Sequence, residues 1–92
     1  MTNNDFKTLI ESCGLYYMGE EHNMSPHGYF KGEFVCYLDC LGKVLIFNPH
    51  NAQICYEGYE PKTIKKHITK YIDYVRTKII QEKTDIINQM II

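Results

Sequence analysis

The chain has 92 residues, a formal net charge of −1 and 45% hydrophobic residues, the composition of one globular domain. These values exclude a disordered chain and leave no room for a second domain within residues 1–92. The sequence shows neither a signal peptide nor an apolar run long enough to cross a membrane, so we expect a cytoplasmic protein without membrane contact. Its four cysteines are then expected to be reduced thiols.

A short helix is predicted over residues 5–13. Asn4 is a suitable N-cap, and Gly14 can adopt the left-handed conformation that ends many helices. Between them, apolar residues recur at the spacing of one helix face: Phe6, Leu9, Ile10 and Cys13.

Four strands of an antiparallel meander are predicted in the middle of the chain. Each is an apolar or alternating run bounded by residues that favour turns. The predicted strands are residues 15–18, 33–38, 43–47 and 53–56. Residues 19–28 are predicted to be a loop, because they combine acidic and polar residues with a proline.

The predicted strands carry apolar side chains on both faces. In residues 33–38, strict alternation predicts Phe34, Cys36 and Leu38 on one face, with Val35 and Tyr37 on the other. A sheet of this kind needs a cover on each face. We expect one helix on the first face, and the loop, the other helix or a partner on the second.

A long amphipathic helix is predicted over residues 61–91. Pro61 suits its first turn, and no Gly or Pro follows. Its apolar stripe consists of Ile64, Ile68, Tyr71, Ile72, Val75, Ile79, Ile86 and Met90. Such a helix is roughly 45 Å long, whereas a compact domain of this size is about 30 Å across. The predicted fold is therefore α+β, in the order α-β-β-β-β-α, with a final helix that exceeds its body.

The apolar end of this helix needs a cover, because it would otherwise promote aggregation. It could pair with its copy in a homodimer, break near Thr84 and Asp85 and fold back on the sheet, or dock on an unrelated partner. The residues predicted to self-associate are Ile79, Ile86, Ile87, Met90 and Ile91.

Charge is distributed unevenly along the chain. Residues 1–60 carry three Lys against eight Asp or Glu, whereas residues 61–83 carry six Lys and one Arg against two acidic residues. This basic segment supports an alternative function as a nucleic-acid-binding module. The residues that would contact the phosphates are Lys62, Lys65, Lys66, Lys70 and Arg76.

No catalytic signature is present, and we expect neither an enzyme nor a bound cofactor. The candidate metal ligands do not have the spacing of common zinc sites, so buried thiols and exposed histidines are the preferred interpretation. These candidates are Cys13, Cys36, Cys40, Cys55, His22 and His27. His50 and Asn51 resemble part of a metal-dependent nuclease site but lack supporting ligands.

The favoured prediction is a non-catalytic homodimer that binds another macromolecule, namely a protein or a ribonucleoprotein nuclease complex. Tyrosine is common in interfaces, and the residues predicted to bind the partner are Tyr29, Phe30, Tyr59 and Tyr74. Twelve Ile and nine Lys against one Ala and one Arg indicate AT-rich codons. This bias suggests a phage or mobile element of a low-GC bacterium, and hence an inhibitor of a host nuclease or defence system.

Overall fold

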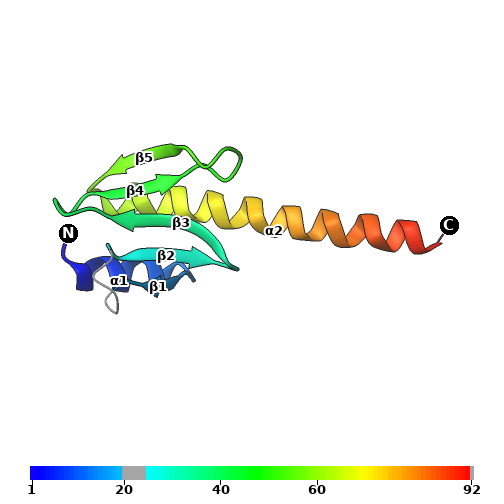
Figure 1. The fold of residues 1–92 in the computed structure, drawn as a ribbon, viewed down its shortest axis with the longest axis horizontal. Helices are drawn as coiled ribbons and strands as arrows, with labels where there is room; N and C mark the ends of the chain where they lie inside the picture. The colour runs from blue at the N-terminus through cyan, green and yellow to red at the C-terminus, as the bar shows by residue number, and fades with distance from the viewer. Residues whose placement is uncertain (20–24, 92) are drawn as a thin grey trace.

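The computed structural model describes residues 1–19 and 25–91, with side chains described in 1–19 and 25–83. It is an α+β fold in which five consecutive strands are preceded by one helix and followed by another (Figure 1). The elements are α1 (Asn3–Ser12), β1 (Tyr16–Met18), β2 (His27–Phe30), β3 (Glu33–Leu38), β4 (Val44–Phe47), β5 (Ile54–Gly58) and α2 (Pro61–Ile91). Among these residues, no helix is both long and apolar enough to cross a membrane.

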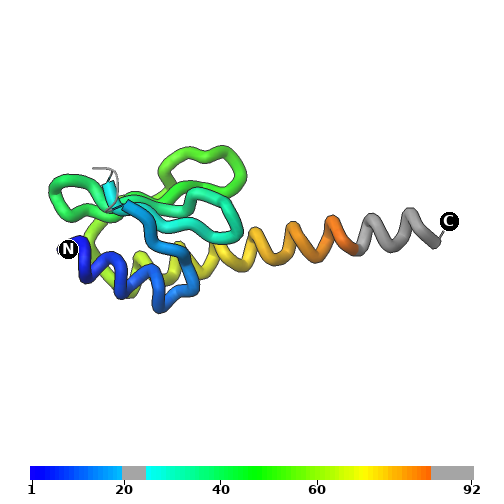
Figure 2. The backbone as a smooth tube through the Cα atoms, turned by 60° about the horizontal axis from the view of Figure 1, so that its bottom comes forward, coloured from blue at the N-terminus to red at the C-terminus, as the bar shows by residue number. Residues whose placement is uncertain are grey.

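The fold has two layers. All five strands form one antiparallel sheet in the order β1-β2-β3-β4-β5, so each strand pairs with its neighbour in the chain. Both helices lie on the same side of this sheet, as Figure 2 shows. We name the face that packs on the helices the inner face, and the opposite face the outer face.

The prediction of a first helix is confirmed, although its start differs from the predicted one. Thr2 is the N-cap in place of Asn4: its hydroxyl accepts a hydrogen bond from the Asp5 amide at 3.1 Å. The Asp5 carboxylate in turn accepts one from the Thr2 amide at 3.4 Å, which completes a capping box. Gly14 follows the helix with a φ of 88°, the left-handed conformation expected of it.

The sheet has five strands, and the prediction of four missed β2. Its first two residues, His27 and Gly28, had been assigned to the loop. They form a strand because both edges of β2 are paired: Tyr17 lies opposite Gly28 in β1, and Cys36 lies opposite it in β3. Tertiary pairing has here overridden the weak strand propensity of glycine.

Gly28 lies beneath the side chains of Ile10 from α1 and of Leu15, which follows that helix. A Cβ atom at this position would lie 3.1 Å from the side chains of Ile10 and Leu15, and 3.3 Å from the Cys36 sulfur. The absence of a side chain therefore allows α1 to pack directly on β2.

The predicted alternation along β3 is wrong at one position. The β2–β3 pairing steps from Gly28↔Cys36 to Tyr29↔Phe34, so Val35 is an extra residue in β3. Such a β-bulge lets two consecutive side chains share a face. Val35 and Cys36 are both fully buried in the core, while Phe34 and Tyr37 belong to the outer face.

One hydrophobic core lies between the inner face and the helices. Its fully buried members come from α1, β3, β4 and α2. They are Phe6, Ile10, Val35, Cys36, Val44, Ile46, Ile64 and Ile68. The first half of the stripe predicted on α2 is thus confirmed as core, down to Val75.

The length of α2 is confirmed, and the prediction that it could fold back is wrong. The helix continues through Thr84 and Asp85 as far as Ile91. Its last core residue is Val75, and Ile79 packs against the core only in part. The molecule therefore measures 54 × 27 × 23 Å, with a radius of gyration of 15.2 Å, against about 12 Å for a compact chain of this length.

Candidate functional site

The outer face carries a cluster of aromatic rings that no helix covers. It consists of His27 and Tyr29 from β2, Phe34 and Tyr37 from β3, and Phe47 from β4, and we name it the aromatic cluster. Phe34 is its centre, because its ring contacts the other four rings at centroid distances of 5.0 to 6.3 Å. Edge-to-face and tilted contacts of this kind fix the ring orientations.

Exposed apolar residues flank the aromatic cluster on both edge strands. Tyr16 pairs with Tyr29, Met18 pairs with His27, and Ile54 pairs with Phe47, so all three belong to the outer face. Their exposed fractions are 68% for Tyr16, 47% for Met18 and 46% for Ile54. Apolar surface therefore extends across the whole sheet from β1 to β5.

His27 is the buried polar group of this face. Its side chain is 6% exposed, and its Nδ1 atom has no hydrogen-bond partner among the described residues. The ring lies between Tyr29 and Phe34, at 5.7 and 5.3 Å. His27 therefore lies in β2 as one ring of the aromatic cluster. The sequence instead places it in a loop, as a candidate metal ligand.

Few charges border the outer face. Lys43 lies 3.6 Å from the carboxylate of Glu57, and this ion pair spans β4 and β5 at one end of the sheet. Glu57 lies opposite Leu45, which is only 6% exposed although it faces away from the core. The face is therefore largely apolar, and Lys43 at its end is paired with Glu57.

The four residues predicted to bind a partner are not brought together. Tyr29 belongs to the aromatic cluster, whereas Phe30 is buried on the inner face, with the Arg76 guanidinium over its ring at 5.7 Å. Tyr59 is 55% exposed just before α2. Tyr74 lies on α2 and packs against the ring of His50 at 4.2 Å.

The residues of the nucleic-acid alternative lie on α2, in the helix layer. The side chains of Lys62, Lys65, Lys66 and Lys70 are all exposed. Burial, followed by the positive charges of Lys70 and Lys66, lowers the pKa of the neighbouring His67, whose ring stacks on Tyr56. The structure therefore gives α2 a basic exposed side, separate from the aromatic cluster.

Of the residues predicted to self-associate, only Ile79 has a described side chain, and it is half-buried. The side chains of Ile86, Ile87, Met90 and Ile91 lie outside the described residues. Ile80, the residue after Ile79, has a side chain with an exposed fraction of 64%.

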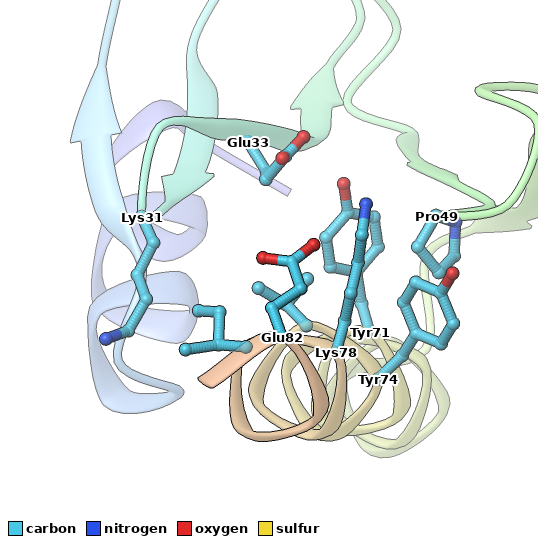
Figure 3. A pocket seen from close by; sticks show the side chains of 9 residues that line it. Lys31, Glu33, Pro49, Tyr71, Tyr74, Lys78 and Glu82 are labelled. Atoms are coloured by element: carbon cyan, nitrogen blue, oxygen red, sulfur yellow. The ribbon is translucent and has the colours of Figure 1, made fainter. Parts of the chain in front are cut away.

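A pocket of about 290 Å³ lies where α2 leaves the body (Figure 3). Val75 and Ile79 of α2 contribute its apolar part. Its remaining lining residues are Lys31, Glu33, Pro49, Tyr71, Tyr74, Lys78 and Glu82. The Tyr71 hydroxyl donates a hydrogen bond to the Phe34 carbonyl at 3.2 Å, and burial together with Glu33 raises the Tyr71 pKa. This pocket thus joins α2 to the turns that precede β3 and follow β4.

The candidate metal ligands are dispersed. In the described part of the chain, no three His, Cys, Asp or Glu side chains lie close enough together to hold a metal ion. Cys36 is buried, which raises the pKa of its thiol to about 12, whereas Cys40 and Cys55 are exposed. His22 lies outside the described residues.

No protein-family model, curated protein or solved structure matched this chain.

Proposed function

We propose that the chain is a non-catalytic interaction protein that acts as a homodimer and binds a second protein through its outer face. The observation that carries this proposal is the aromatic cluster, in which four rings contact the central ring of Phe34 on an apolar sheet face. Contiguous apolar surface of this kind marks interaction sites in small proteins.

The contacts within the aromatic cluster make this face suitable for tight binding. Tyr29, Tyr37 and Phe34 are held by neighbouring rings, so binding would order few additional rotatable bonds. Aromatic residues also offer a large contact area at low entropic cost, and tyrosine adds a hydroxyl at the rim. A preformed apolar surface with polar tips supports binding to a protein.

The charge of the outer face favours a protein over a nucleic acid. Proteins that stack bases on aromatic rings combine them with a positively charged groove. Here Lys43 is paired with Glu57, and the exposed lysines Lys62, Lys65, Lys66 and Lys70 lie on α2, in the helix layer. The outer face therefore lacks the positively charged groove that phosphates require, whereas binding to a protein does not require one.

The prediction that the partner belongs to a host nuclease or defence system rests on codon bias and chain length, and it stays a prediction.

Two exposed substitutions test the outer face. We expect Tyr16→Asp combined with Ile54→Asp to weaken partner binding at least about tenfold, because each carboxylate would have to be desolvated in the interface. The partner is first captured from the native host with the wild-type chain, and its affinity for each variant is then measured by titration. Both residues are exposed, so the fold should be retained.

The matched control introduces the same two carboxylates elsewhere. Leu41→Asp combined with Tyr59→Asp also replaces two exposed apolar residues, which have exposed fractions of 75% and 55%. This control should bind the partner like the wild type. If the control loses binding and the outer-face variant keeps it, the binding site includes Leu41 or Tyr59 instead of the outer face, which would contradict the proposal.

The basic side of α2 is tested separately. We expect Lys65→Glu combined with Lys66→Glu to leave partner binding unchanged, because both lysines are exposed in the helix layer. Titration of single- and double-stranded DNA and RNA at low salt supplies the rival measurement. Tight binding that falls steeply with salt and disappears in this variant would establish the nucleic-acid alternative instead.

A further inference from the structure

The chain exposes more surface than a compact monomer of its mass. Its accessible surface is 6435 Å² at 10.8 kDa, whereas a compact monomer of that mass exposes about 5,500 Å². The excess is roughly 900 Å² per chain, so two copies that buried it would remove roughly 1,800 Å². Stable interfaces bury about 1,200–2,000 Å² in total. One further copy is thus sufficient to cover the excess.

The part of α2 beyond Ile79 extends past the hydrophobic core, whose last buried residue on this helix is Val75. Its helical backbone continues to Ile91, about 18 Å past Ile79, and we name residues 80–91 the projecting segment. Within it the sequence places apolar residues at positions 80, 86, 87, 90 and 91, which repeat at helical spacing. This segment has the composition of one half of a helix–helix interface.

The side of α2 on which these positions fall restricts how a second helix can approach. Ile79 packs against the core of its own body. Position 86 comes seven residues later, which is only about 20° away around the helix. The apolar line therefore continues on the side of α2 where the body lies. A helix that runs along this line meets the body at the pocket beside Lys31 and Pro49.

We propose that the projecting segments of two copies pair in antiparallel orientation, an arrangement that rests on the homodimer of the proposed function. In a parallel pair, both bodies would occupy the same end and collide, because each lies on the apolar side of its own helix. In the antiparallel pair, each body lies beyond the far end of the other projecting segment. The turns at Lys31 and Pro49 then stop further sliding and limit the overlap to about 18 Å.

Electrostatics favour the same orientation. The dipoles of the two α2 helices oppose each other in antiparallel pairing. The dimer consequently presents two separate outer faces.

The test uses the full chain and one pair of matched variants. Ile86→Glu with Met90→Glu places two carboxylates on the apolar line, and Gln81→Glu with Asn88→Glu places two on the opposite side of the helix. Light scattering across a concentration series measures the mass, and small-angle X-ray scattering measures the longest dimension. We expect a wild-type mass twice that of one chain, and a length of roughly 90 Å from two 54 Å molecules that overlap by about 18 Å.

The two variants are expected to differ in oligomeric state. The Ile86→Glu, Met90→Glu chain should dissociate at least about a hundredfold more readily, because two carboxylates would be buried without partners, and the control should remain a dimer. A dimer close to 54 Å long, or one that survives both glutamates, overturns antiparallel pairing but leaves the homodimer standing. A monomer at every concentration overturns both. Partner binding by the dissociated variant shows separately whether the outer face functions.

Discussion

Replacement of Ile68 by alanine is expected to lower the free energy of unfolding by about 2–5 kcal/mol. Ile68 is fully buried at the centre of the layer between α2 and the sheet. The substitution removes three carbon atoms and leaves a cavity that the surrounding side chains can fill only in part. Since small domains are stable by only about 5–15 kcal/mol, this is a large fraction of the total.

The measurement is urea denaturation, with the midpoint and slope fitted separately. It is best made in the Ile86→Glu, Met90→Glu background, so that dimer dissociation does not contribute to the apparent stability. Leu41→Ala provides the control, because Leu41 is 75% exposed in the turn before β4, and it should change stability by less than about 0.5 kcal/mol. Equal losses from the two substitutions would contradict the assignment of Ile68 to the core.

Replacement of Gly28 by valine is expected to destabilise the protein by about 1–3 kcal/mol. Valine favours strands, so local propensity alone predicts the opposite sign. Valine is nevertheless expected to destabilise the fold, because a Cβ atom at Gly28 would lie 3.1 Å from the Ile10 and Leu15 side chains. The added methyl groups would push α1 away from the sheet.

A double-mutant cycle tests whether this steric contact is the cause. Leu15→Ala removes one of the atoms that the new side chain would meet, and Leu15 is itself 5% exposed. The two losses should therefore combine to less than their sum, with an interaction energy of about 0.5–2 kcal/mol. Strictly additive losses would show that contact with Leu15 is not the reason for glycine at this position.

Local sequence signals predicted the helices and most of the meander. The apolar stripe from Ile64 to Val75 and the absence of glycine or proline after Pro61 fix α2 without reference to the rest of the chain. The turn at Gly42, with a φ of 80°, is equally local. These features depend on the spacing of neighbouring residues, which a single sequence displays.

The strand β2 could not be predicted in the same way. His27 and Gly28 have little strand propensity, and they become a strand because β1 and β3 pair on either side. The bulge at Val35 likewise arises from a shift in pairing between two strands. Both features are set by non-local register, which the spacing within one segment does not contain.

The sequence predicts the outer face only as a second apolar face that needs a cover. Its residues could not be assigned, because the bulge exchanges the faces of Phe34 and Val35 relative to strict alternation. The placement of both helices on the inner face is also a tertiary outcome. The partner residues chosen for being aromatic were therefore divided between the two faces, with Tyr29 outside and Phe30 inside.

The order of the elements has a consequence for synthesis on the ribosome. Every strand pairs with its predecessor, so the meander can form as the chain emerges. Its inner face, however, takes Ile64, Ile68, Tyr71, Ile72 and Val75 from α2, the last element to be made. Until that helix leaves the exit tunnel, the nascent sheet is apolar on both sides. Completion of the domain core thus waits for α2, and the nascent chain exposes its largest apolar surface until that helix has emerged.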